Sequence, residues 1–128
     1  MKLLKIFILS FFISTTSFAE NLYVMDNSSP GAKDCFQVIK DFDVIIKDAE
    51  LFGIFEDAER LESAINQGEY ISYYYGYELG VAQALNQPIN SAYSRAELSK
   101  IFVDTCKERK LGDKFFTILP EIYKIKNM

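Results

Sequence analysis

The chain has 128 residues, enough for one domain, and carries 18 acidic against 14 basic side chains, with no histidine and no tryptophan. The acidic balance argues against a nucleic-acid partner and against an anionic membrane surface, because both favour proteins with surplus lysine and arginine. Histidine is the commonest general base and metal ligand, and the sequence also contains no phosphate-binding loop. We therefore expect no enzymatic activity, no catalytic residues, no metal and no cofactor.

Residues 1–19 have the pattern of a secretory signal peptide. Two lysines precede an apolar run over Ile6–Ile13 that is too short to span a bilayer, and Ser17-Phe18-Ala19 forms a small-x-small cleavage site. We expect export to the periplasm, cleavage after the alanine and no membrane association afterwards. The mature chain would keep 12 of the 14 bases and all 18 acids, a net charge of −6. Residues 20–33 are rich in turn formers and are expected to be a flexible mature N-terminus.

Two helical patterns precede residue 66. A helix is expected from about 34 to about 48, with Asp34 at its N-terminal cap and apolar residues at helical spacing. A second helical stretch follows over 51–61, although Gly53 weakens it. Asn66-Gln67-Gly68 then predicts a break or a loosening of the helix.

The segment 69–85 has the densest apolar pattern in the chain and predicts the central, most buried helix. It should end before Pro88, because the residue preceding a proline is pushed out of the helical region. Ser94 and Glu97 form a capping box that begins the next helix, which ends in a basic run.

A last helix follows Asp113, and Pro120 is expected to kink or divide it. No segment has the period-two pattern of a strand. Residues 34–128 are therefore predicted to form a single all-α domain, a small orthogonal bundle of four to five helices clamped by one disulfide.

The two cysteines, Cys35 and Cys106, lie 71 positions apart on two predicted helices. In an oxidising compartment we expect a structural disulfide between them, and closing a loop of this length stabilises a fold by about 4 kcal/mol on chain-entropy grounds. A catalytic redox pair would need CxxC-like proximity, and a zinc site would need more ligands than two thiolates without histidine. The structural bridge is the preferred interpretation.

Small residues recur along one face of the predicted central helix, at Gly76, Gly80 and Ala84. Such a stripe lets another backbone approach closely. It predicts tight helix packing inside the bundle or, alternatively, a groove for a homodimer.

Tyrosines surround the same helix at positions 70, 73, 74, 75 and 77. Most are expected to be core or half-buried, with hydroxyls that reach the rim. Because tyrosine is enriched at interfaces, the alternative is a protein-binding patch formed by Tyr70, Tyr73, Tyr74 and Tyr77.

Charge is unevenly distributed along the chain. Nine acids and two bases lie between Asp41 and Glu69, whereas eight bases and five acids lie from Arg95 onward. The densest acidic run, Glu56-Asp57-Ala58-Glu59, is interpreted as solvated charge rather than a catalytic pair, which would need two carboxylates facing each other in a cleft. The asymmetry predicts two solvated faces of opposite sign, or a pattern that steers a partner.

Three segments and the leader together resemble the HdeA/HdeB family of small periplasmic acid-stress chaperones. The segments are Asp34-Cys35-Phe36, Val103-Asp104-Thr105-Cys106-Lys107 and the lysine-rich tail over 122–128, so the resemblance covers roughly residue 34 to the end. It implies a helical domain tied by the Cys35–Cys106 bridge. It also implies an acid-activated holdase whose partners are unfolded proteins, with a homodimer near neutral pH. This chain differs in having a longer insert between its cysteines.

The segment over 76–85 is similar to the central helix of the Rap/Tai immunity proteins, which are periplasmic antidotes to peptidoglycan-cutting effectors. This second resemblance implies a protein that binds and neutralises one secreted effector. The cysteine placement departs from that family's usual pattern. Both resemblances imply a periplasmic protein-binding domain, and they differ in the partner that it binds.

Overall fold

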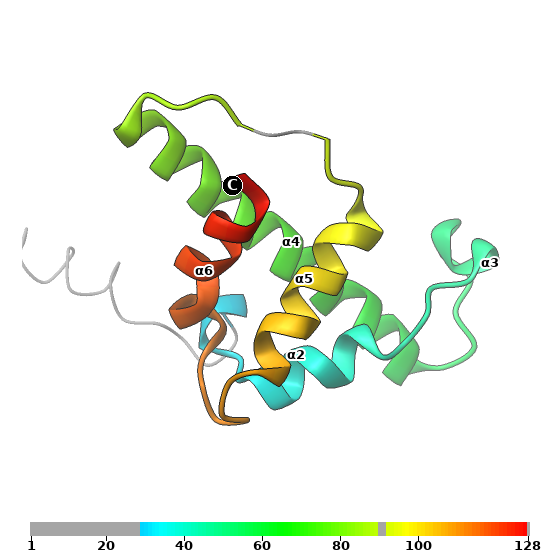
Figure 1. Cartoon of the computed structure of the whole chain (residues 1–128). Helices are drawn as coiled ribbons and strands as arrows, with labels where there is room; N and C mark the ends of the chain where they lie inside the picture. The colour runs from blue at the N-terminus through cyan, green and yellow to red at the C-terminus, as the bar shows by residue number, and fades with distance from the viewer. Residues whose placement is uncertain (1–28, 90–91, 128) are drawn as a thin grey trace, which may run out of the picture.

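The computed structural model describes residues 29–89 and 92–127 (Figure 1). A short 3-10 helix, η1 (Pro30–Ala32), precedes five α-helices: α2 (Cys35–Phe42), α3 (Asp48–Leu51), α4 (Ala58–Leu85), α5 (Arg95–Lys107) and α6 (Phe115–Asn127). No strand occurs in this part of the chain, and the predicted all-α fold with one disulfide is confirmed. The predicted signal peptide and residues 20–28 lie outside the described residues.

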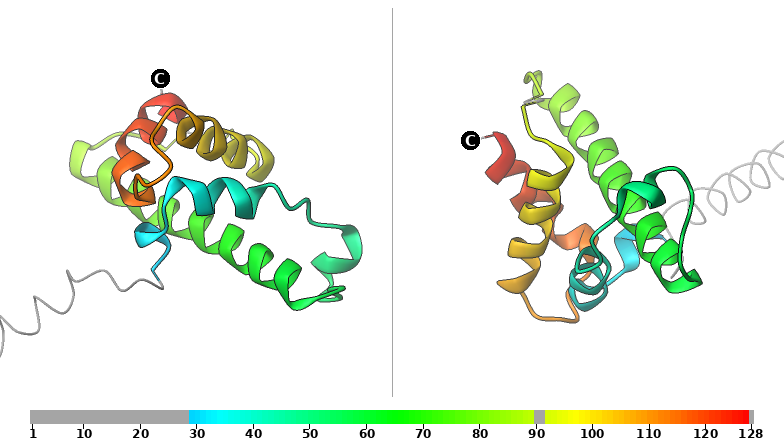
Figure 2. Two further views of the ribbon diagram at one scale, coloured as in Figure 1. Left: turned by 90° about the horizontal axis from the view of Figure 1, so that it is seen from below. Right: turned by 90° about the vertical axis from the view of Figure 1, so that its right-hand side faces the viewer.

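The long helix α4 is the element around which the others are arranged. The helices η1, α2, α5 and α6 all contact it, and α5 also packs against both α2 and α6. The short helix α3 stands apart at one end of the molecule, beyond α2 and α5, as the left view of Figure 2 shows. The fold is therefore a bundle with one small projecting element.

The core is rich in aromatic rings that α4 shares with its neighbours. The Phe102 ring of α5 and the Phe115 ring of α6 meet edge to face with centroids 5.2 Å apart, and Tyr70 and Tyr74 of α4 pack on them at 5.1 and 5.6 Å. Such pairs add stabilisation beyond the apolar area that they bury. The other buried residues of this cluster are aliphatic or cysteine: Cys35, Val38, Leu98, Cys106, Ile118, Leu119 and Ile122.

The segment that enters α2 is fixed by the loop between α5 and α6. The Cys35 amide donates to the Asp113 carbonyl and the Phe115 amide donates to the Lys33 carbonyl, both at 2.8 Å. Gly31 is buried against the Tyr73 ring, where an added Cβ would lie 2.4 Å from the hydroxyl oxygen. Residues 29–33 are thus packed on the bundle, and the flexibility expected for residues 20–33 stays a prediction.

Helix α4 runs without interruption through residues 66–68, so the predicted break there is wrong. The Gln67 side chain donates to the carbonyls of Asp41 and Val44 at 2.8 Å each, and Asn66 donates to the Asp41 carboxylate at 3.3 Å. These polar residues hold the end of α2 against α4, and the tertiary contacts outweigh their weak helix preference.

The chain between α2 and α4 also differs from its predicted form. The first helix ends at Phe42 rather than near 48. In place of one helical stretch over 51–61, the structure has the end of α3, a loop over 52–57 and the first turn of α4. Gly53 follows the end of α3 with a φ of +87°, a conformation that glycine adopts readily, so it terminates a helix rather than weakening one.

Three further local predictions can be compared directly with the structure. The Asp34 cap and the Ser94–Glu97 capping box are confirmed, with the capped amides 2.9 and 3.1 Å from the side-chain oxygens. Helix α6 continues through Pro120 and is not divided.

Candidate functional site

The Cys35–Cys106 bridge joins the first turn of α2 to the last turn of α5. The two Cα atoms are 5.1 Å apart, and both residues are completely buried in the core. The predicted structural disulfide is therefore confirmed, and it connects two helices that also pack on each other.

The tyrosines predicted as a protein-binding patch divide into two groups. Tyr70 and Tyr74 are core residues, and Tyr73 and Tyr77 are partly buried against that core. Burial, followed by the hydrogen bond to Asp41, raises the pKa of Tyr70. A patch that includes Tyr70 and Tyr74 is wrong for the folded domain, because neither ring is accessible to a partner.

The small-residue stripe lies on the solvent side of α4. Gly76, Gly80 and Ala84 are exposed, and an added Cβ at either glycine would meet no atom within 4 Å. Close packing of this stripe inside the bundle is therefore wrong. The buried face is formed instead by residues spaced three or four apart: Gln67, Tyr70, Tyr74, Glu78 and Ala82. A homodimer at the exposed stripe stays a prediction.

Sequence reasoning missed three buried carboxylates, and each of them links α4 to a different element. The first is Asp41 on α2, which is 2 % exposed. Its Oδ2 atom accepts from the Tyr70 hydroxyl at 2.8 Å and from the Asn66 amide at 3.3 Å, while Oδ1 accepts from Gln37 at 3.1 Å. Two of these three donors lie on α4.

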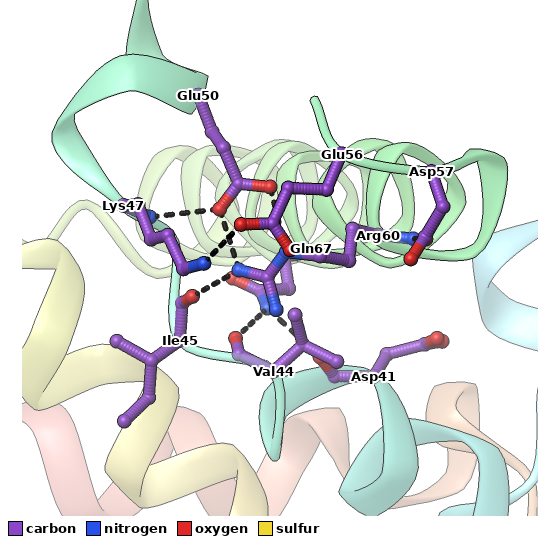
Figure 3. A network of polar contacts seen from close by, with 9 residues as sticks. All are labelled: Asp41, Val44, Ile45, Lys47, Glu50, Glu56, Asp57, Arg60 and Gln67. Atoms are coloured by element: carbon purple, nitrogen blue, oxygen red, sulfur yellow. Dashed lines mark hydrogen bonds and ion pairs between the residues drawn. The ribbon is translucent and has the colours of Figure 1, made fainter. Parts of the chain in front are cut away.

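The second carboxylate is Glu50 on α3, which meets Arg60 on α4 (Figure 3). The guanidinium is bidentate, with Nε 2.8 Å from Oε2 and Nη2 2.5 Å from Oε1. The same Nη2 donates to the Ile45 carbonyl at 2.7 Å, and the Lys47 amide donates to Glu50 at 3.0 Å. These hydrogen bonds, that of Arg60 above all, lower the pKa of Glu50 to about 2.

The third carboxylate is Glu78 on α4, which pairs with Lys126 on α6. The Nζ atom lies 2.6 Å from Oε1, and each side chain is 1 % exposed. The ammonium also lies over the rings of Tyr75 and Tyr93, 5.7 and 5.9 Å from their centroids. Burial, followed by the neighbouring Glu78 carboxylate, raises the pKa of Tyr74.

These three contacts attach α4 to the rest of the bundle through buried carboxylates. Asp41 holds it to α2, Glu50 holds it to α3 and Glu78 holds it to α6. A buried ion pair is strongly destabilising once one partner loses its charge, because the other charge stays in a low-dielectric site. The helical register carried a signal for Glu78, since it lies on the same face as Tyr74 and Ala82.

A second feature is an apolar projection, here called the α3 protrusion (residues 48–54). Its Phe52 side chain is 85 % exposed, and Leu51 and Ile54 are also exposed, as is Ile45 just before it. Exposed apolar residues that are grouped in this way mark interaction surfaces more often than scattered ones do.

Beside the α3 protrusion lies a surface hollow of about 600 Å³, here called the α5 groove. Phe42, Val44 and Ile46 form one side of it and Val103 of α5 lies on the other. The basic side chains that line it are Arg95, Lys100 and Lys107.

Within the described ranges, no helix is long and apolar enough to cross a membrane, and no three potential metal ligands form a group. No protein-family model matches the chain, and neither a curated protein nor a solved structure is significantly similar to it.

Proposed function

We propose that the protein is a periplasmic protein-binding domain that acts as a holdase chaperone in acid. The observation that supports this best is the set of three buried carboxylates, Asp41, Glu50 and Glu78, which attach α4 to three different elements. Loss of carboxylate charge in strong acid would weaken all three contacts, so α4 would loosen on several sides. The resemblance to the acid-stress chaperones points in the same direction.

Acid changes the balance of charge in the whole domain as well as at these contacts. Near pH 2 most carboxyl groups are protonated, and the chain after residue 19 carries about 12 positive charges on its lysines and arginines. The negative charge that Glu50 and Glu78 place beside Arg60 and Lys126 is then reduced, and the bundle repels itself. The loosened domain would expose the buried rings of Tyr70 and Tyr74 to unfolded clients. In this proposal the tyrosines bind proteins in acid and not in the native fold.

The disulfide limits how far the chain can expand in acid. It joins α2 to α5, and neither cysteine depends on pH once it is oxidised. The expanded chain therefore keeps a closed loop of residues that includes α3 and α4. This favours a compact acid state with apolar surface over a fully extended chain.

Light scattering tests the proposal directly. An unrelated enzyme that aggregates in acid is mixed with the purified, oxidised protein at pH 7 and at pH 2, and we expect suppression of aggregation at pH 2 only. ANS fluorescence of the protein alone should rise over the same range. Equal activity at both values, or none at either, would contradict the proposal.

A variant that mimics protonation separates the buried carboxylates from general acid effects. Asp41→Asn, Glu50→Gln and Glu78→Gln together should bind ANS and suppress aggregation at pH 7. The matched control makes the same change of charge at three exposed acids: Glu62, Glu69 and Glu108. If both variants behave like the wild type at pH 7, the buried carboxylates do not control activity.

The second candidate function is an immunity protein for one secreted effector. It is favoured by the exposure of Gly76, Leu79 and Gly80, because the segment that resembles the immunity helix then lies partly on the surface. A pull-down from periplasm at pH 7 distinguishes the two candidates. One stoichiometric partner would support the immunity function, and no partner would support the chaperone.

A further inference from the structure

The α3 protrusion and the α5 groove have complementary chemistry, and both occur on one chain. Leu51, Phe52 and Ile54 present apolar side chains to solvent. The apolar residues that line the groove include Phe42, Ile46 and Val103. Covering both surfaces would remove exposed apolar area from water, which is the main favourable term in protein association.

Their charges are also opposite. Asp48, the first residue of the protrusion, and Glu59, in the first turn of α4, form no ion pair with any described residue. Among the groove's bases, Lys100 pairs with Asp104, whereas Arg95 and Lys107 likewise have no ion pair within the part of the chain that the structure describes. Opposite charges left without partners on two surfaces favour their association and fix its orientation.

The protrusion of one chain is held away from the groove of that same chain. The Glu50–Arg60 ion pair and the hydrogen bond from Arg60 to the Ile45 carbonyl attach α3 to the first turn of α4 (Figure 3). The protrusion therefore points outward, as Figure 1 and the left view of Figure 2 show. Its apolar residues need a surface from outside the chain.

We infer that the occupant of the α5 groove is the α3 protrusion of a second copy of this chain. Residues 43–47 form a side of the groove and lead directly into α3, so the two surfaces are neighbours. A two-fold axis near this segment lets each copy insert its protrusion into the groove of the other. Such a self-complementary contact closes as a dimer and does not propagate into a fibre.

Analytical ultracentrifugation of the purified, oxidised protein at pH 7 tests this inference. We expect a dimer, and we expect Phe52→Asp and Val103→Asp each to raise the dimer Kd at least about 30-fold, as for a central interface residue. Phe116→Asp is the matched control, since Phe116 is an exposed phenylalanine on α6, and its Kd should stay within about threefold of the wild-type value.

Charge reversal gives a second test that does not depend on a core substitution. Arg95→Glu with Lys107→Glu should weaken the dimer, and adding Asp48→Lys with Glu59→Lys to the same chain should restore it. Circular dichroism checks that each variant is folded.

Three results would overturn the inference. The first is a strictly monomeric protein at about 1 mM, which would leave the groove to a different partner. The second is a dimer that Phe52→Asp does not weaken. The third is a dimer that Gly80→Leu breaks instead. The last result would place the interface on the small-residue stripe of α4. None of these results bears on acid-dependent client binding, so this inference and the proposed function can fail separately.

Discussion

Replacing Lys126 by methionine tests how much the buried pair with Glu78 contributes to the fold. Methionine keeps most of the apolar stem and removes the charge, while Glu78 stays 1 % exposed with no ammonium 2.6 Å away. Removing one partner of a buried ion pair destabilises a protein by about 3–5 kcal/mol. For a small domain, whose total stability is about 5–15 kcal/mol, this is a large fraction.

Urea unfolding at pH 7, followed by circular dichroism, measures the loss. The double variant Glu78→Leu with Lys126→Met should recover most of it, because an apolar pair of similar volume often replaces a buried ion pair without penalty. The control is Arg109→Met, whose partner Glu121 and own side chain are each 36 % exposed, and it should change stability by no more than about 1 kcal/mol. A loss below about 1 kcal/mol for Lys126→Met, or simple additivity in the double variant, would refute the reasoning.

Three further predictions concern stability. Replacing Cys35 and Cys106 by serine should lower the free energy of unfolding by about 4 kcal/mol, and an unchanged urea midpoint would contradict this. The hydrogen bond from its arginine partner lowers the pKa of Glu50 from 4.5 to about 2, so this carboxylate stabilises the fold above pH 4.5 and loses that effect as the pH falls towards 2. The urea midpoint of the wild type should therefore exceed that of Glu50→Gln at pH 6, and the two should converge near pH 2. Gly31→Ala should cost about 1–3 kcal/mol because its Cβ would overlap a tyrosine ring, whereas Gly80→Ala, in open space on a helix, should raise Tm.

The sequence was sufficient to predict those features that only one or two residues determine. The caps at Asp34 and Ser94 follow from hydrogen bonds within one helical turn, and the disulfide follows because the chain has only two cysteines. The break at 66–68 could not be excluded in this way, because Gln67 stays helical through hydrogen bonds to residues more than 20 positions away.

The candidate site was less accessible to sequence reasoning than the fold. Acidic residues are usually solvated, so Asp41 and Glu50 looked like part of an acidic face. Their burial follows from partners supplied by α4, which only the folded arrangement brings near them. Whether the small-residue stripe faces the core or solvent could not be predicted for a similar reason. The orientation of α4 depends on which of its tyrosines enter the core.

The length of α4 has a consequence for how motion in this protein can be observed. At 1.5 Å per residue its 28 residues extend about 42 Å, so the helix is a rigid rod with the α3 protrusion at one end and the connection to α5 at the other. Spin labels near its two ends should report a constant separation as long as the rod persists. A third label on α5 would then show whether the rod swings away as one body or melts, a distinction that overall size measurements miss.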